Sequence, residues 1–136
     1  MNTKNILTVM GVVMGLQGIG IFFGAESITK EAFAALEPQE TGITIGAMLH
    51  EVMGVMCVMV AIILLMSRSL APAAASKVLL GASIGIAMTT AHGFYNMFSS
   101  PVKPPLPLLL IMIALGVVGF ITAFKAKASD AAPAAE

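Results

Sequence analysis

Four long apolar stretches occupy most of this 136-residue chain, and they decide what it can fold into. They cover residues 6–24, 43–66, 78–98 and 105–124. A helix needs about 20 predominantly apolar residues to cross the hydrocarbon core of a bilayer, so each stretch can span a membrane. Hydrophobic residues make up 58% of the chain and charged residues only 10%, too few to cover a water-soluble core. We therefore predict an all-α integral membrane protein, a single bundle of four transmembrane helices over residues 1–124.

The charges that flank these stretches predict an orientation. Five cations would lie on one side of the membrane and two on the other: Lys4, Arg68, Lys77, Lys125 and Lys127 against Lys30 and Lys103. Cytoplasmic loops carry the excess of Lys and Arg, so we expect both termini on the cytoplasmic side of a bacterial inner membrane. Residues 125–136, rich in alanine and charge, are expected to form a disordered cytoplasmic tail. Seven basic and seven acidic residues leave no net charge to attract nucleic acid.

The connection between the first two stretches, residues 25–42, has a helical pattern of its own. Ser27 can cap a short helix with its apolar residues on one face (Ile28, Ala32, Ala35 and Leu36), and Pro38 ends it. We expect this amphipathic helix to lie on the outer surface of the membrane.

Six residues with amide, imidazole, carboxyl or phenol side chains lie inside the first three apolar stretches: Gln17, His50, Glu51, His92, Tyr95 and Asn96. At ~1.5 Å per residue, Gln17, His50 and His92 each lie about 9–10 Å from the outer end of their stretch. Such residues are costly in a membrane and mark pathways, cofactors or partners. The pattern predicts one shared, outward-facing polar site near the outer leaflet.

The first function that this pattern suggests is cofactor binding in a redox role. His50 and His92, on neighbouring antiparallel helices, are placed as the axial ligands of haem b would be. Glu51 would then set the charge of the site, and Gln17, Tyr95 and Asn96 would supply hydrogen bonds. A quinone head group could use the same residues.

The second possibility is the binding or transport of a metal ion. His50, Met53 and Cys57 recur along one face of the second stretch and suit Cu(I), whereas His50, Glu51 and His92 suit Zn or Fe. The third possibility is a non-catalytic accessory or assembly subunit of a larger membrane complex, or a homo-oligomer. Its docking surfaces would be glycine-rich helix faces: Gly11, Gly15 and Gly18; Gly81 and Gly85; Gly116 and Gly119. No motif of a hydrolytic enzyme is present, because the HExxxG at residues 50–54 lacks the second histidine of a zinc protease.

Several features extend along the membrane part, residues 5–124. They are a glycine-rich first helix (MGVVMGLQGIGIFFG), a short segment that ends Leu-Glu-Pro at 36–38, a glycine-containing second helix (GAMLHEVMGV), and a fourth helix followed by a charged tail. In these features the chain resembles the DoxX-like group of small four-helix bacterial membrane proteins. The resemblance implies a four-helix bundle and favours a redox role, because some members of that group act in quinone-linked sulfur oxidation. It assigns no role to His50, Glu51 or His92, for which that group has no matching motif.

Overall fold

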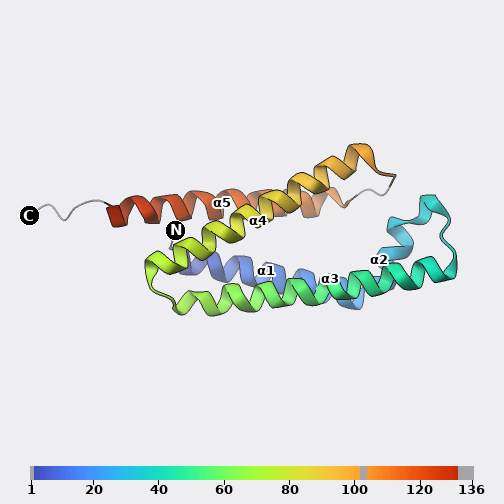
Figure 1. Ribbon diagram of the computed structural model, residues 1–136, viewed down its shortest axis with the longest axis horizontal. Helices are drawn as coiled ribbons and strands as arrows, with labels where there is room; N and C mark the ends of the chain where they lie inside the picture. Colours follow the sequence, from blue (N-terminus) through green and yellow to red (C-terminus); the bar gives the residue numbers. More distant parts are fainter. Residues whose placement is uncertain (1, 102–103, 132–136) are drawn as a thin grey trace, which may run out of the picture.

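The computed structural model describes residues 2–101 and 104–131, with side chains as far as Ala126. Four long helices make up most of it: α1 (Thr3–Phe23), α3 (Glu40–Met66), α4 (Pro72–Ser99) and α5 (Leu106–Ala131). The short elements are α2 (Ala25–Ala32) and two 3-10 turns, η1 (Ala34–Leu36) and η2 (Ser67–Ser69). All four long helices are long and apolar enough to cross a membrane, which confirms an all-α multi-pass membrane bundle (Figure 1).

Two helix boundaries differ from the sequence-based expectation. Helix α4 begins at Pro72, six residues before the predicted stretch, because proline at the first helical position needs no backbone N–H partner. Helix α5 continues to Ala131, so residues 125–131 are helical and not the disordered tail we predicted. Three alanines and two lysines among these seven residues are good helix formers, which explains the extension. Residues 132–136 of that predicted tail lie outside the described residues.

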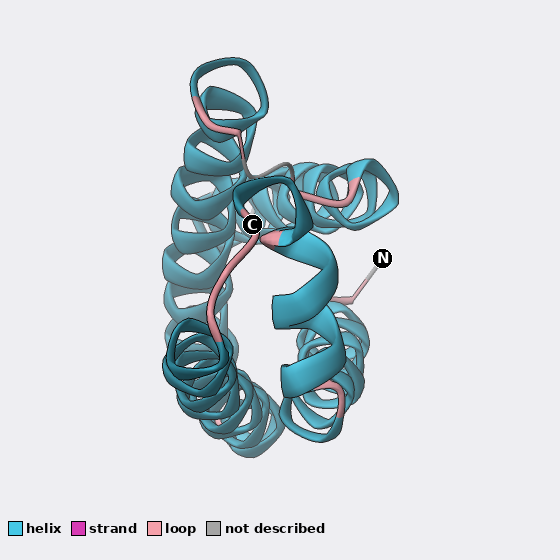
Figure 2. Ribbon diagram, turned by 90° about the vertical axis from the view of Figure 1, so that its right-hand side faces the viewer, coloured by secondary structure: helices cyan, strands magenta, loops and turns pink. Residues whose placement is uncertain are grey.

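The long helices pair as two antiparallel hairpins, α1 with α3 and α4 with α5. In the first hairpin, Gly18 and Gly54 bring the two backbones together: a Cβ on Gly18 would lie 2.6 Å from the Gly54 carbonyl oxygen, and one on Gly54 would lie 2.7 Å from the Gly18 carbonyl oxygen. Small residues allow such close approach between membrane helices. Figure 2 shows the helices along the bundle from the end that carries α2. In the chain, α2 and η1 lie between α1 and α3.

One level of the bundle joins both hairpins. Gly119 of α5 packs against Ser83 of α4 and also against the sulfur of Met10 on α1. The next residue on α1, Gly11, packs against Leu65 of α3. We call this the common level, because all four long helices meet there.

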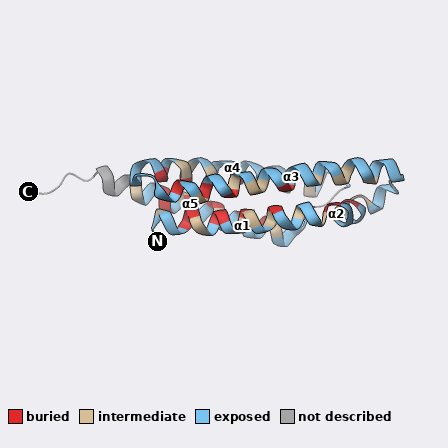
Figure 3. Cartoon of the chain, turned by 90° about the horizontal axis from the view of Figure 1, so that it is seen from below, coloured by how far each residue is buried: buried red, intermediate tan, exposed pale blue. Residues whose placement is uncertain are grey.

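The buried residues gather around the common level and thin out toward the end that carries α2, which we call the α2 end (Figure 3). Leu7, Met10 and Leu79 are fully buried there. At the α2 end, α3 packs on α1 and α2, whereas α4 packs on α5. The two hairpins therefore separate toward the α2 end, as the course of α3 and α4 in Figure 1 shows.

Helix α2 differs from the predicted surface helix. It begins at Ala25, directly after Gly24, and Ser27 does not cap it. Its buried residues are Ala25 and Thr29, which pack toward α3, whereas Leu36 of the predicted apolar face is about half exposed. Gly46 of α3 lets Thr29 of α2 pack closely against that helix. The periodicity of apolar residues does not reveal such a contact.

Candidate functional site

The most elaborate polar arrangement in the described residues is built around His50 on α3. Its Nδ1 lies 2.8 Å from the carbonyl oxygen of Gly46, one turn earlier on the same helix, and 3.0 Å from Oγ1 of Thr29 on α2. Thr29 is only 1% exposed, and His50 is half-buried. A histidine in the membrane segment is thus held from two sides by protein groups.

These contacts fix which ring nitrogen of neutral His50 carries the proton. The Gly46 carbonyl oxygen can only accept a hydrogen bond, so Nδ1 must donate. The hydroxyl of Thr29 donates its single proton to the carbonyl oxygen of Ala25, 2.8 Å away, and therefore also accepts from Nδ1. Neutral His50 consequently carries its proton on Nδ1 and a lone pair on Nε2, for which the described part of the chain supplies no hydrogen-bond partner.

Gly46 makes this arrangement possible. A Cβ at this position would lie 2.5 Å from Cγ2 of Thr29, far inside van der Waals contact. Glycine thus allows α2 to approach α3 until the threonine hydroxyl reaches the imidazole.

Glu51 points to a different surface from His50. It is exposed and lines a pocket of about 460 Å³ between α2 and the start of α3, together with Glu26, Lys30 and Glu40. Lys30 forms an ion pair with Glu26, one turn away on α2. Glu51 has no hydrogen bond or ion pair within the described residues. A carboxylate inside a predicted span therefore lines a polar pocket that is also lined by the positively charged side chain of Lys30.

His92, Tyr95 and Asn96 lie together on α4. The Asn96 amide nitrogen lies 3.1 Å from Nε2 of His92; because an amide nitrogen can only donate, Nε2 accepts and the ring proton is on Nδ1. His92 is exposed, as is Tyr95 at 67%. The two histidines therefore have different partners: His50 is held by α2, and His92 by its own helix.

The two histidines also lie at different distances from the common level. From Leu65 to His50 there are fifteen residues along α3, and from Ser83 to His92 there are nine along α4. At ~1.5 Å per residue these are about 23 Å and about 14 Å along the two helices. His50 is thus about 9 Å closer to the α2 end. The equal depth estimated from sequence assumed that the apolar stretches end level with one another, and they do not.

Gln17 lies one turn deeper than His50. Its neighbour Gly18 faces Gly54, and His50 follows four residues further toward the α2 end. The Oε1 atom of Gln17 is buried without a hydrogen-bond partner in the described residues. A buried carbonyl oxygen of this kind calls for a donor, which water or a ligand can supply.

The predicted soft metal ligands on α3 have separate surroundings. The Cβ of Cys57 lies against Gly18 in the α1–α3 contact, whereas Met53 is 45% exposed. In the described part of the chain, no three His, Cys, Asp or Glu side chains are grouped so that they could hold a metal ion. The set of His50, Glu51 and His92 therefore does not come together there.

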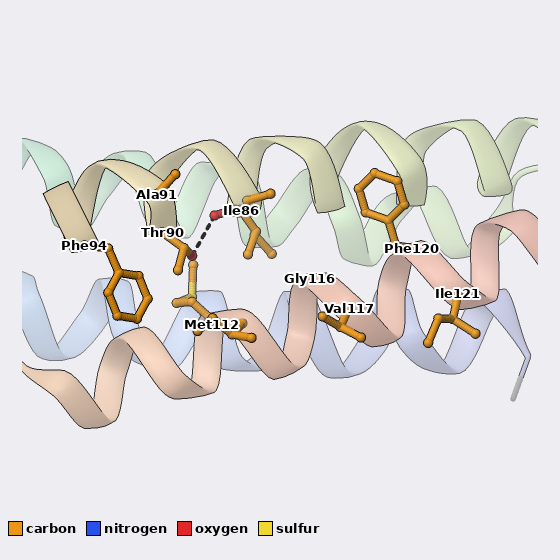
Figure 4. Close-up of a pocket in the computed structure, with 11 residues that line it drawn as sticks. Ile86, Thr90, Ala91, Phe94, Met112, Gly116, Val117, Phe120 and Ile121 are labelled. Atoms are coloured by element: carbon orange, nitrogen blue, oxygen red, sulfur yellow. Dashed lines mark hydrogen bonds between the residues drawn. The ribbon is translucent and has the colours of Figure 1, made fainter.

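A second hollow, which was not predicted from sequence, lies between α4 and α5 (Figure 4). It has a volume of about 440 Å³ and an almost wholly apolar lining that includes Phe94, Met112 and Phe120. The hydroxyl of Thr90 donates to the carbonyl oxygen of Ile86 on its own helix, so it is already satisfied. This apolar hollow suits a hydrocarbon chain, such as the acyl chain of a lipid.

The contribution of Thr29 could not be predicted from sequence. It is a lone threonine on a short helix, and only the approach of α2 to Gly46 brings it to His50.

No protein family, curated protein or solved structure matches the chain, so the site is interpreted from its geometry.

Proposed function

We propose that the protein binds a small ligand or redox cofactor in the outer half of a bacterial inner membrane, with both termini in the cytoplasm. In this proposal the α2 end faces outward, and His50 is the residue that holds the ligand. The observation that carries the proposal is the state of the His50 ring, with Nδ1 committed to protein oxygens and Nε2 without a partner among the described residues. Ligating histidines have this arrangement, in which a backbone carbonyl fixes one nitrogen and orients the other.

The cost of polar groups in a membrane supports a binding role. His50 and Glu51 lie in a candidate membrane span, where ionisable groups are rare and mark functional sites. Gln17 adds a buried oxygen without a donor one turn deeper. Three such groups near one end of the α1–α3 hairpin favour a ligand there.

Among the redox cofactors, a quinone fits this arrangement better than haem b. A haem held by His50 and His92 needs both imidazoles at one level, whereas they differ by about 9 Å along their helices. A quinone or quinol head group needs only one of them. The resemblance to the DoxX-like group, some members of which act in quinone-linked oxidation, points the same way.

An optical spectrum tests the choice of cofactor. The protein is purified in mild detergent with native lipid, and absorption is recorded before and after dithionite. We expect no Soret band and a co-purified quinone or quinol in the lipid extract. The amount of this compound should be smaller in His50→Phe, a variant that keeps an aromatic ring at this position. A Soret band that shifts on reduction and disappears in His50→Phe would replace quinone by haem. Unchanged ligand content in His50→Phe would refute the role of His50.

A second candidate function, that of a partner-binding accessory subunit, is favoured by one face of α4. Cβ atoms on Gly81 and Gly85 would meet no described atom within 4 Å, and Met88 and His92 on the same face are exposed. Small residues at this spacing support contacts between membrane helices. If this face binds a partner, Gly85→Leu should abolish co-purification of that subunit, and Gly20→Leu, equally open but on α1, should not.

A further inference from the structure

We infer that the ligand of His50 donates a hydrogen bond to Nε2 and that Thr29 positions His50 to accept it. The site therefore binds a quinol, or a similar ligand with a hydroxyl group, in preference to a quinone with its carbonyl oxygen. This inference rests on the proposed function, because it presumes that His50 binds the ligand. It adds the chemical class of the ligand and a residue that acts through another.

The hydrogen bond from Thr29 to Ala25 determines the other hydrogen-bond roles around His50. The carbonyl oxygen of Ala25 takes the only hydroxyl proton of Thr29, and Thr29 Oγ1 then has only lone pairs to offer to Nδ1. The carbonyl oxygen of Gly46 requires the same proton on Nδ1. Both contacts favour the same tautomer, which leaves Nε2 of the neutral ring as an acceptor.

An acceptor nitrogen discriminates between the two redox states of a quinone. The hydroxyl of a quinol can donate to Nε2, whereas the carbonyl oxygen of a quinone would place one lone pair against another. A metal ion would also bind a lone pair, but the described side chains do not group around His50 as further ligands. The hydroxyl donor is therefore the class that the surroundings favour.

The threonine is held firmly enough to act as a positioning residue. Its side chain is 1% exposed, and its methyl group occupies the space left by the missing Cβ of Gly46. It is not a catalytic residue, because its hydroxyl is committed to Ala25 and His50. Its effect on the ligand passes through the imidazole.

Nitrogen NMR of the imidazole tests the tautomer directly. The chain has two histidines, so a His92→Gln background leaves His50 as the only source of imidazole signals. In lipid nanodiscs at alkaline pH, we expect Nδ1 protonated and Nε2 unprotonated. Thr29→Val should lower the population of this tautomer, Thr29→Ser should restore it, and Thr44→Val should leave it unchanged. Thr44 is the matched control, because its hydroxyl donates to the carbonyl oxygen of Glu40 on its own helix and, among the described residues, does not contact His50. An Nε2-protonated ring in the parent protein would overturn the inference.

Binding of a short-chain quinol and of the matching quinone tests the ligand class. We expect the quinol to bind at least about tenfold more tightly, and Thr29→Val to reduce this preference about fivefold, as expected for loss of one net hydrogen bond. Equal binding of the two, with both lost in His50→Phe, would refute the donor class and leave the proposed function standing. Binding that is unchanged in His50→Phe would refute the proposed function itself. Failure of both compounds to bind would overturn the inference.

Discussion

Replacing Gly54 with alanine tests the closest contact between α1 and α3. The new Cβ would lie 2.7 Å from the Gly18 carbonyl oxygen, 2.8 Å from the Phe22 amide nitrogen and 3.0 Å from the Phe22 Cβ. Two of these three atoms belong to backbone, so no side-chain rotation can relieve the contact. Ordinary contact begins at 3.4 Å, so α1 must move away by about 0.7 Å, the difference between 3.4 and 2.7.

The cost of this movement can be estimated from the contacts that it weakens. A gap of about 0.5–1 Å forfeits a quarter to a half of the dispersion energy of each atom pair facing it. Adding a methylene to a well-packed contact typically costs about 1–3 kcal/mol. We therefore expect Gly54→Ala to lower the free energy of unfolding by about 1–3 kcal/mol.

The control is Gly20→Ala on α1, where a Cβ would have no atom of the described part of the chain within 4 Å. Alanine has the higher helix propensity, so this variant should be unchanged or more stable by up to about 1 kcal/mol. Both variants can be unfolded reversibly by adding SDS to mild-detergent micelles, with helix content followed by circular dichroism. A Gly54→Ala protein as stable as Gly20→Ala would refute the proposed close contact between the two glycines.

Two further predictions concern α4 and α2. Ser83→Leu should destabilise the bundle by about 1–3 kcal/mol in the same unfolding assay, because the side chain is fully buried against Gly119; Ser83→Ala should change stability by less than about 1 kcal/mol. A Leu variant as stable as the Ala variant would contradict the contact between α4 and α5. On α2, the hydrogen bond and charge of Lys30 hold the pKa of the Glu26 carboxyl below its ordinary value. A carboxyl whose pKa is lowered in the folded state adds stability above its unfolded pKa and loses it as pH falls through the folded pKa. Carbon NMR titration should therefore show the Glu26 pKa rising to its ordinary value in Lys30→Met, and no rise would contradict the ion pair.

The four spans could be predicted from sequence because a long apolar helix is a local property. Length and composition alone placed them to within a few residues, except where Pro72 and the alanines after Lys125 extend helices beyond the apolar stretches. The pairing of the helices could not be predicted in the same way, because it depends on contacts between distant parts of the chain. Glycine spacing indicated close contacts, yet it did not say that Gly18 meets Gly54 or that Gly81 and Gly85 meet none of the described residues.

His50 could be singled out from sequence, whereas the groups that surround it could not be predicted. His50 was identified because an imidazole is costly in an apolar stretch. Its partner Thr29 was not, because that contact depends on how closely α2 approaches Gly46. The pairing of His50 with His92 assumed helices that end level. Whether the two share a ligand stays a prediction, and their separate partners make one histidine the simpler basis for a site.

The glycine contact of the first hairpin and the chemistry of His50 are connected. Gly54 sets how closely α1 lies against α3, and α2 begins immediately after α1, at Ala25. The position of α2 in turn brings Thr29 to His50, which fixes the imidazole proton on Nδ1. A shift of α1 by about 0.7 Å would move α2 with it and so change the contact between Thr29 and His50, because Thr29 packs directly against Gly46. Gly54→Ala should therefore alter the tautomer of His50 as well as stability, whereas Ser83→Leu, in the other hairpin, should lower stability and leave the tautomer unchanged.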